Sequence, residues 1–392
     1  MDQPLPLAHV KVVEMSHMVM GPTVGLVLGD LGADVVKIEP LGGDKTRRLR
    51  GSGAGYFVTY NRNKRSLCLD TSREEARELL LRLVADADVF VENFRPGAMD
   101  RLGLGWEALS ALNPRLVYCS TRGFLEGPYQ HRTALDEVAQ MMGGLAYMTG
   151  PPGRPLRAGA SVIDVTGGMF GAIGVMAALE QRHRTGKGGR VISALYECTA
   201  FLVGQHMAQY AVTGTPAPPM PARISAWAVY DIFDTVDGEQ VFVAVVSDTQ
   251  WPVFCREFGF ADWAVDATLA ANGGRVARRD VIIPALRERL GACTKADLMA
   301  RLERCGLPYA PIARPEELFD DIHLNASGGL LPIDLPEGGQ TRLPALPVSL
   351  DGQRFGVHHP VPTPGRDTRA VLRSLGLPES EIDSLVARGV IG

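Results

Sequence analysis

The stretch from Val10 to Pro40, "VKVVEMSHMVMGPTVGLVLGDLGADVVKIEP", decides the fold class of this chain. It opens with "VKVVEMS" and closes with "DVVKIE", two short apolar runs rich in β-branched residues that are typical of buried strands. Between them, "GPTVGLVLGDLGA" has the length of a helix and contains several glycines. A strand, a helix and a second strand in this order predict a βαβ unit with parallel strands.

The same alternation continues along the first half of the chain. We expect further strands at "RSLCLD" (65–70), "DVFVENF" (88–94), "RLVYCSTRGF" (115–124) and "RVISAL" (190–195). We expect helices at "SREEARELLLRLVADA" (72–87, with Ser72 as N-cap), "MDRLGLGWEALSAL" (99–112), the segment behind Asp164, and "YECTAFLVGQHMAQYAVTG" (196–214). Strands separated by helical crossovers predict an α/β fold with a doubly wound parallel sheet.

The composition and the periodicity of the sequence change after this half. "TPAPPMPARISAW" is proline-rich and indicates a linker, and Asp237-Gly238 between two period-two runs predicts a hairpin within 228–246. Helical patterns follow near 249–258, 276–290 and 295–304, and a Pro/Gly-rich stretch begins at residue 330. We therefore predict a large domain at 1–205, a linker at 206–224, a small α+β domain at 225–330, and a second linker with C-terminal helices that return to the large domain at 331–392.

Composition and charge limit the partners. A net charge of −4 gives no overall basic field of the kind that attracts nucleic acids or anionic membranes. No apolar run reaches the roughly eighteen residues that cross a bilayer, and the first residues lack the pattern of a signal peptide. The cysteines are scattered, which favours a reduced cytoplasm over disulfides or zinc: Cys68, Cys119, Cys198, Cys255, Cys293 and Cys305. We expect a soluble cytoplasmic protein without nucleic-acid, membrane or metal partners.

Asp164 is the residue on which a chemical function depends. It is the one carboxylate in the apolar, glycine-rich run "ASVIDVTGGMFGAIGVMAAL". An Asp at this place is typical of a helix N-cap, and the helix dipole and free N–H groups would keep such a carboxylate ionised. An ionised, partly desolvated carboxylate is also a nucleophile, and Gly167 and Gly168 would let a substrate carbonyl approach it. Capping and catalysis are compatible here.

A series of basic residues in the first half suggests phosphate binding. The segments "GDKTRRLRG" and "NRNKRS" lie after predicted strands, where open α/β sheets bind ligands, and include Arg47 and Lys64. An ordinary solvated face with ion pairs is the alternative. A nicotinamide cofactor is disfavoured because the glycines of "GPTVGLVLGDLGAD" do not form G-x-G-x-x-G.

The ordered motifs of residues 10 to about 200 resemble the class III (CaiB/BaiF) coenzyme A-transferase family. They are "LGDLGADVVKIEP", "NRNKRSLCLD", "ADVFVENFRPGAMDRLGL", "NPRLVYCSTRGF", "EGPY", "VAQMMGG", "RAGASVIDVTGG" and "AALEQRHRTGKGG". The resemblance implies a Rossmann-like large domain, a smaller domain, and two chains threaded through each other as an interlocked-ring homodimer. It also implies acyl-CoA and carboxylic acid as substrates, with no metal.

The resemblance also implies roles for individual residues. Asp164 matches the catalytic aspartate, while Gly167 and Gly168 belong to its oxyanion-binding segment. Coenzyme A would be held by His17, Met18 and Val19 at its thioester end, and by Leu69, Asn93, Phe94, Arg101 and Arg47 towards the nucleotide. Backbone N–H groups at the helix start and near His17 would stabilise oxyanions.

Three functions remain open from the sequence. The first is transfer of coenzyme A from an acyl-CoA to a free acid through an aspartyl-CoA thioester on Asp164. The second is isomerisation of an acyl-CoA on the same fold, which Leu135 disfavours because the racemase branch has a His directly before the acid that is Asp136 here. The third is coenzyme A binding without catalysis.

Overall fold

The computed structural model describes residues 4–223 and 225–392. The first three residues of the predicted large domain and the last residue of the predicted first linker lie outside this description. The chain forms two compact units, one of Met1–Ala222 with Ile322–Gly392 and one of Arg223–Asp321. The second unit is therefore an insertion in the sequence of the first.

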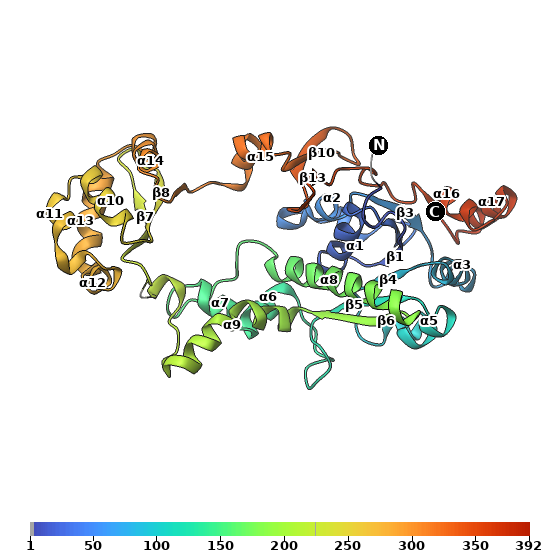
Figure 1. Ribbon diagram of the computed structural model, residues 1–392. Helices are drawn as coiled ribbons and strands as arrows, with labels where there is room; N and C mark the ends of the chain where they lie inside the picture. The colour runs from blue at the N-terminus through green and yellow to red at the C-terminus, as the bar shows by residue number, and fades with distance from the viewer. Residues whose placement is uncertain (1–3, 224) are drawn as a thin grey trace. The chain divides into compact units, whose positions relative to one another are not determined.

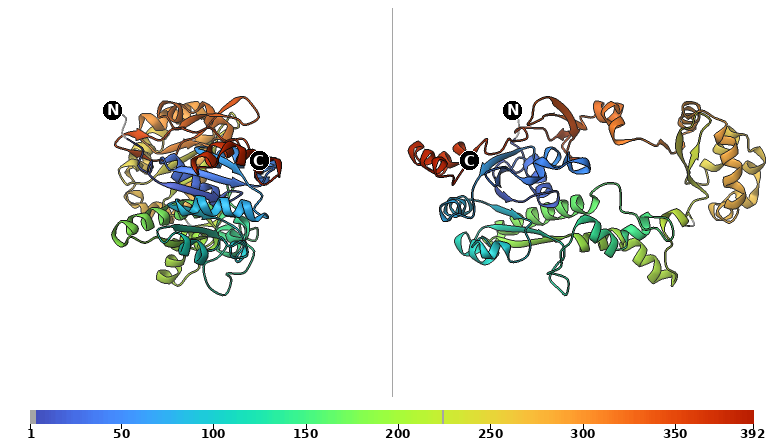
Figure 2. Two further views of the ribbon diagram at one scale, coloured as in Figure 1. Left: turned by 90° about the vertical axis from the view of Figure 1, so that its right-hand side faces the viewer. Right: turned by 180° about the vertical axis from the view of Figure 1, so that it is seen from behind.

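The first unit is built on a parallel sheet, which confirms the prediction of an α/β fold. Six strands pair in the order β3-β2-β1-β4-β5-β6, and all five pairings are parallel. The strands are β1 (Lys11–Met15), β2 (Asp34–Glu39), β3 (Lys64–Cys68), β4 (Val89–Glu92), β5 (Val117–Arg122) and β6 (Gly189–Ala194). In Figures 1 and 2 the strands lie between two layers of helices.

Alternate residues of each strand serve the two layers. Val12 packs with α1 (Met20–Asp30) and α8 (Val162–Thr185) on one face of the sheet. The neighbouring Val13 packs on the other face with α3 (Glu74–Ala85), α5 (Trp106–Leu112), α16 (Thr368–Ser374) and α17 (Glu379–Ala387). This period of two is what a strand buried on both sides requires.

The remaining helices of the first unit are short, apart from α9. They are α2 (Tyr56–Tyr60), α4 (Ala98–Arg101), α6 (Asp136–Met142), α7 (Leu145–Thr149), α9 (Leu195–Thr213) and α15 (Ile322–Ala326). Two antiparallel pairs complete the unit: β10 (Leu330–Asp334) with β11 (Gln340–Pro344), and β12 (Ser349–Leu350) with β13 (Gln353–Arg354).

Three sequence-based expectations for this unit are wrong in detail. Ser72 does not cap α3, because its hydroxyl binds Asp70 and the helix starts two residues later. The helix expected over 99–112 is two helices, since the chain turns at Gly103 with φ +72°. The Pro/Gly-rich stretch after residue 330 is a β-hairpin, β10–β11, rather than an unstructured linker.

The second unit has a small antiparallel sheet covered by helices. The hairpin predicted around Asp237-Gly238 is confirmed as β7 (Val229–Asp234) and β8 (Gln240–Val245), and β9 (Tyr309–Pro311) pairs with β8. Its helices are α10 (Gln250–Phe258), α11 (Ala261–Val265), α12 (Asn272–Ala277), α13 (Arg279–Gly291) and α14 (Lys295–Arg304). Trp251 and Phe254 lie at the centre of its core.

Candidate functional site

Asp164 lies in the first turn of α8 with its side chain partly buried. The helix begins at Val162, and Ser161 occupies the N-cap position. Asp164 is therefore not the helix cap that the sequence suggested. Among residues 4–223 and 225–392, none donates a hydrogen bond to its carboxylate, so both oxygens are available for another partner.

A second acid, Asp136 at the start of α6, caps α8 instead. Its Oδ2 accepts the backbone N–H of Ile163 at 2.9 Å and that of Asp164 at 3.1 Å. Its Oδ1 accepts hydrogen bonds from Gln140 and from Arg157, the latter at 3.3 Å. The sequence singles out Asp136 only through the comparison with the racemase branch, and nothing local indicates that it caps another helix.

This arrangement changes the protonation state of Asp164. Burial raises the pKa of Asp164 from 3.8 to about 7; the charge of Asp136 adds to the rise and that of Arg157 opposes it. We expected the helix start to keep the carboxylate fully ionised, and this expectation is wrong. The N–H groups that would stabilise the anion donate to Asp136 instead. Asp164 therefore changes its protonation state near neutral pH.

Gly167 and Gly168 face α1 rather than an opening for substrate. A Cβ on Gly168 would lie 2.7 Å from the backbone oxygen of Met20 and 2.5 Å from Cβ of Thr23. A Cβ on Gly167 would lie 2.4 Å from Cε of Met20. Both glycines are needed because α1 and α8 approach closely, and they lie inside the helix rather than in an oxyanion-binding loop.

A largely apolar groove of about 770 Å³ lies at the carboxyl ends of the first strands. His17 and Met18, which follow β1, line it together with Leu69, which follows β3, and Phe94, which follows β4. The fold thus brings together four of the residues expected to hold coenzyme A. Lys45 supplies a cation at the same groove. The carboxyl edge of a parallel sheet is where open α/β folds bind ligands.

The turn at His17 is held by side chains from neighbouring strands. Asn93 accepts the N–H of His17 at 3.0 Å and donates to its carbonyl at 2.7 Å. Met18 has a positive φ of 64°, and its N–H donates to Oγ1 of Thr46 at 3.0 Å. These N–H groups already have acceptors, so our expectation that they would stabilise oxyanions is wrong.

The turn and the start of α8 are adjacent through Met20. This residue begins α1 two positions after Met18, and its side chain fills the space in front of Gly167, one turn beyond Asp164. Met20 thus connects the turn at His17 to α8, although neither Met20 nor Asp164 lines the groove itself.

Other expected residues lie elsewhere. Val19 is buried, with 1% of its surface exposed. The guanidinium of Arg47 binds both oxygens of Glu39, at 2.8 and 2.6 Å, and the carbonyl of Pro362 at 2.7 Å, so its donors are directed away from a ligand. Arg101 is exposed on α4, outside the lining of the groove.

The basic segment "NRNKRS" is structural rather than ligand-binding. Arg62 forms a buried pair with Asp30 at 2.7 Å. Lys64 is buried against Glu14, at 2.7 Å, and donates to the carbonyl of Pro22. Burial lowers the pKa of Lys64 to about 8. The expectation that these cations bind phosphate is wrong because they are buried in ion pairs with acids of β1 and α1. These acids are distant in the sequence, so the local pattern does not reveal them.

In the described part of the chain, no three His, Cys, Asp or Glu side chains gather as metal ligands would. One helix, α8, is long and apolar enough by length and composition to cross a bilayer, so the expectation that no apolar run reaches that length is wrong; core helices of soluble proteins share this property. Its buried face packs on α1 and on the sheet.

The chain matches the model of CoA-transferase family III over residues 7–368. It is 31% identical to mouse succinyl-CoA:glutarate CoA-transferase over 398 residues, which cover 100% of this chain and 91% of that one. It is 32% identical to the succinate–glutarate CoA-transferase of Agrobacterium fabrum, covering 94% and 96%. It is 33% identical to the acetyl-CoA:oxalate CoA-transferase of Acetobacter aceti, covering 88% and 90%.

Solved structures agree with these sequence relationships. A CaiB/BaiF family protein from Brucella suis superposes with a TM-score of 0.84 at 35% identity, covering 95% of this chain and all of that one. A hypothetical protein from Mycobacterium tuberculosis superposes with a TM-score of 0.82 at 27% identity, covering 94% and 100%.

Proposed function

Because the chain belongs to CoA-transferase family III, we propose that it moves coenzyme A from an acyl-CoA donor to a free carboxylic acid through a covalent thioester on Asp164. One observation carries the covalent step: the Asp164 carboxylate has no hydrogen-bond donor in the described chain, and it lies one turn before Gly167, which Met20 at the start of α1 contacts. A carboxylate without partners reacts more readily than one in an ion pair.

The bond changes balance without a metal or redox partner. The ionised carboxylate of Asp164 attacks the thioester carbonyl of the donor, and the CoA thiolate leaves, which gives a mixed anhydride. The thiolate then attacks the aspartyl carbonyl, and the donor acid leaves as a carboxylate, which gives aspartyl-CoA. The acceptor carboxylate attacks this thioester, and the thiolate returns to the acceptor's carbonyl and restores Asp164.

In this proposal the groove binds the nucleotide and pantetheine parts of the substrate. The side chains of Met18, Leu69 and Phe94 provide apolar walls, and Lys45 provides a cation for phosphate. The ring of His17 lies 5.3 Å from that of Phe94, and burial lowers the pKa of His17. A neutral imidazole at neutral pH suits the apolar part of the ligand.

Isomerisation needs a base on each side of the substrate's α-carbon. The structure places Asp136 beside Asp164, but the oxygens of Asp136 already accept two backbone N–H groups and the side chains of Gln140 and Arg157. Removing a proton would require breaking these bonds. The contacts of Asp136 therefore favour transfer over isomerisation.

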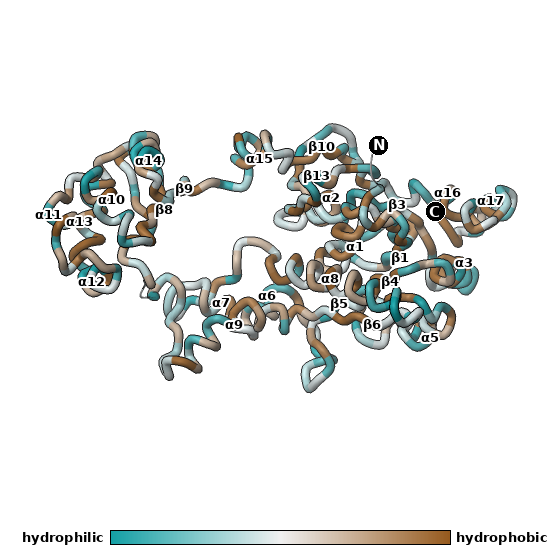
Figure 3. The backbone as a smooth tube through the Cα atoms, in the orientation of Figure 1, coloured by the Kyte–Doolittle hydropathy of each residue, from teal (hydrophilic) through white to brown (hydrophobic). Residues whose placement is uncertain are grey.

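A homodimer is also part of the proposal. Apolar side chains are exposed along α8 and α9, and Figure 3 shows apolar residues along α9. They are Met169, Ile173, Phe201, Met207, Tyr210 and Val212. Exposed apolar patches of this kind mark interfaces. A second copy of the chain, as in the interlocked-ring dimer implied by the family, would bury them.

The covalent step can be tested by trapping. The protein is incubated with succinyl-CoA and then with hydroxylamine, and the peptide that contains Asp164 is examined by mass spectrometry. We expect a hydroxamate on Asp164 only when the donor is present, and no CoA exchange into glutarate by Asp164→Asn. Asp262→Asn, on the exposed surface of the second unit, is the control. CoA exchange without any adduct on Asp164 would contradict the proposal.

A further inference from the structure

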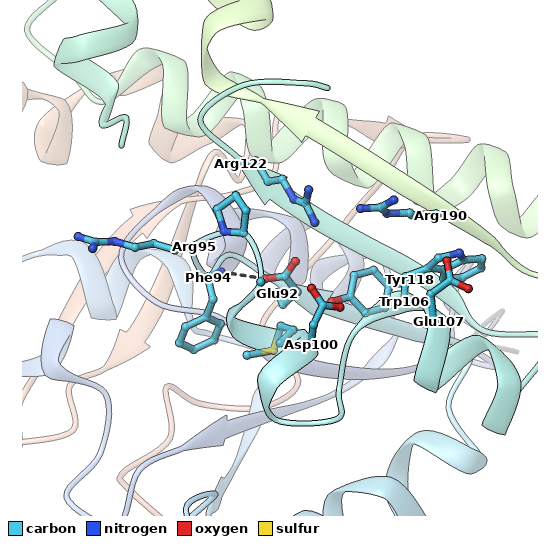
Figure 4. A pocket seen from close by; sticks show the side chains of 12 residues that line it. Glu92, Phe94, Arg95, Asp100, Trp106, Glu107, Tyr118, Arg122 and Arg190 are labelled. Carbon is cyan, nitrogen blue, oxygen red and sulfur yellow. Dashed lines mark hydrogen bonds between the residues drawn. The ribbon is translucent and has the colours of Figure 1, made fainter. Parts of the chain in front are cut away.

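A second cavity, of about 240 Å³, lies on the other face of the sheet from α8 (Figure 4). Its lining includes Tyr118, which belongs to the core cluster under α3 and α5, whereas the next residue, Cys119, belongs to the cluster under α8. Since successive residues of a strand point to opposite faces, this cavity and the helix that carries Asp164 are on opposite sides of the sheet.

Two arginines face each other across this cavity. Figure 4 shows the guanidinium groups of Arg122, from the end of β5, and Arg190, from β6, pointing towards one another. Nε of Arg122 donates to Ser120 at 2.7 Å, and its terminal nitrogens have no acceptor in the described chain. Within the residues that the structure describes, Arg190 hydrogen-bonds to Glu126 alone, at 3.5 Å. Two facing guanidinium groups repel each other, and a carboxylate between them would match their planar donors.

The opposite wall of the cavity is acidic. Glu92 is 2% exposed and accepts hydrogen bonds from Ser120 and from the N–H of Phe94. Asp100 and Glu107 also line the cavity, and their carboxylates have no hydrogen-bond donor among residues 4–223 and 225–392. Across this same part of the chain, no ion pair joins Arg122 or Arg190 to these acids. Ser120 accepts from Arg122 and donates to Glu92, so these two groups are linked through one hydroxyl, whereas in the described chain Asp100 and Glu107 are not joined to either arginine by an ion pair.

The cavity is separate from the groove proposed for coenzyme A. Among the residues that line the two, Phe94 is the one they share. The arginines, Trp106 and Tyr118 line the second cavity alone. A ligand could therefore occupy it while the groove is filled.

We propose that the Arg122–Arg190 cavity binds a small organic carboxylate whose other end donates a hydrogen bond, at a site distinct from Asp164. The carboxylate lies between the two guanidinium groups, and the hydroxyl or ammonium donor at the other end reaches Asp100 or Glu107. A purely anionic ligand such as phosphate is disfavoured because it would leave the acidic wall without a donor.

Three compounds of equal chain length test this chemistry by isothermal titration calorimetry on the full chain with coenzyme A saturating the groove. They are 4-aminobutyrate, 4-hydroxybutyrate and pentanoate, which differ only in the group at the far end. We expect the first two to bind at least about tenfold more tightly than pentanoate, since only they bring a hydrogen-bond donor to the carboxylates of Asp100 and Glu107. Inorganic phosphate should not compete with 4-aminobutyrate.

Variants locate the binding. R122Q and R190Q should each weaken 4-aminobutyrate at least about tenfold, and Asp100→Asn should reduce its advantage over pentanoate. R184Q removes an exposed charge outside the cavity and should bind normally. Asp164→Asn should also bind normally. Thermal melting checks that R122Q folds, and the exposed Arg190 provides a second variant. Unchanged binding in both arginine variants, or lost binding in Asp164→Asn, would overturn the proposal.

Discussion

The carboxylate of Asp136 accepts the backbone N–H of Asp164 at 3.1 Å, so one acid holds the helix start that carries the other. This contact has two effects on Asp164. It consumes the donors that would otherwise stabilise a negative charge there, and it places a second negative charge nearby. Asp136 is thus a positioning residue that also raises the pKa of its neighbour.

Replacing Asp136 should separate these two effects. Asp136→Asn keeps an oxygen that can accept an N–H group but removes the charge, so we expect the pKa of Asp164 to fall and CoA exchange to extend to lower pH. Asp136→Ala also removes the cap and should cost about 1–2 kcal/mol of stability. A pH profile of kcat/KM and urea unfolding measure the two outcomes. A purely structural role would leave the pH profile of Asp136→Asn unchanged.

The pKa of Asp164 predicts the pH dependence of exchange. Since the proposed nucleophile is the carboxylate and its pKa is about 7, kcat/KM should rise with pH and reach half of its plateau near pH 7. Initial rates with succinyl-CoA and glutarate between pH 5.5 and 9 measure this. A rate that is flat through this range would mean that Asp164 does not act as a free carboxylate.

The raised pKa of Asp164 also predicts that the folded protein becomes more stable when the charge of this side chain is removed. The pKa of Asp164 is higher in the folded protein than in the unfolded chain, so ionisation of this group opposes folding. Its contribution to the free energy of unfolding is therefore fully present below pH 3.8 and is lost as pH rises through 7. Asp164→Asn should therefore be more stable than the parent at pH 8.5, by about 2 kcal/mol after solvent screening, and by less at pH 5.5. Urea unfolding at both pH values tests this, with Asp262→Asn as a control that should show no difference.

Strands and most helices of the first unit could be predicted because their signals are local. The apolar, β-branched residues of "DVVKIE" are by themselves enough to indicate a buried strand, and β2 has the expected bounds. The partners of polar residues could not be predicted in this way. Lys64 appears as a surface cation until the fold places Glu14 beside it, and Asp136 appears as an ordinary acid until α8 begins next to it.

Gly168 shows that close packing between helices also cannot be predicted from local sequence. In the sequence, a glycine next to a candidate nucleophile suggests space for substrate. In the structure that space is filled by Met20 and Thr23 of α1, a helix more than a hundred residues earlier in the chain. The glycine is explained by a contact that no local pattern contains.

Gly168→Ala should therefore destabilise the first unit. Its Cβ would lie 2.7 Å from a backbone oxygen, which cannot move without separating α1 from α8, so we expect a loss of about 2–3 kcal/mol. Gly273→Ala is the matched control, because a Cβ there meets nothing within 4 Å and Ala favours the helix. Urea unfolding measures both. Equal stability of the two variants would mean that the helices do not pack this closely.

The hydrogen bond between Thr46 and Met18 should control binding at the groove. Thr46→Val keeps the shape of the side chain but removes the acceptor for the N–H of Met18, whose positive φ is then no longer held. We expect KM for acyl-CoA to rise several-fold, as a loss of about 1 kcal/mol implies, with little change in kcat. Thr59→Val, whose hydroxyl donates to the carbonyl of Gly55 at the start of α2, is the control. A fall in kcat without a change in KM would assign Thr46 to the chemistry instead.

The exposed apolar face of α8 and α9 predicts the oligomeric state. If a second chain covers this face, Phe201→Glu should place a charge in the interface and shift the protein towards monomers, because Phe201 is 71% exposed in the single chain. Val281→Glu, at a position of α13 in the second unit that is 49% exposed, should leave the mass unchanged. Light scattering after size-exclusion chromatography reads both. A parent protein that is already monomeric at micromolar concentration would contradict the dimer, and a dimeric Phe201→Glu would place the interface on another surface.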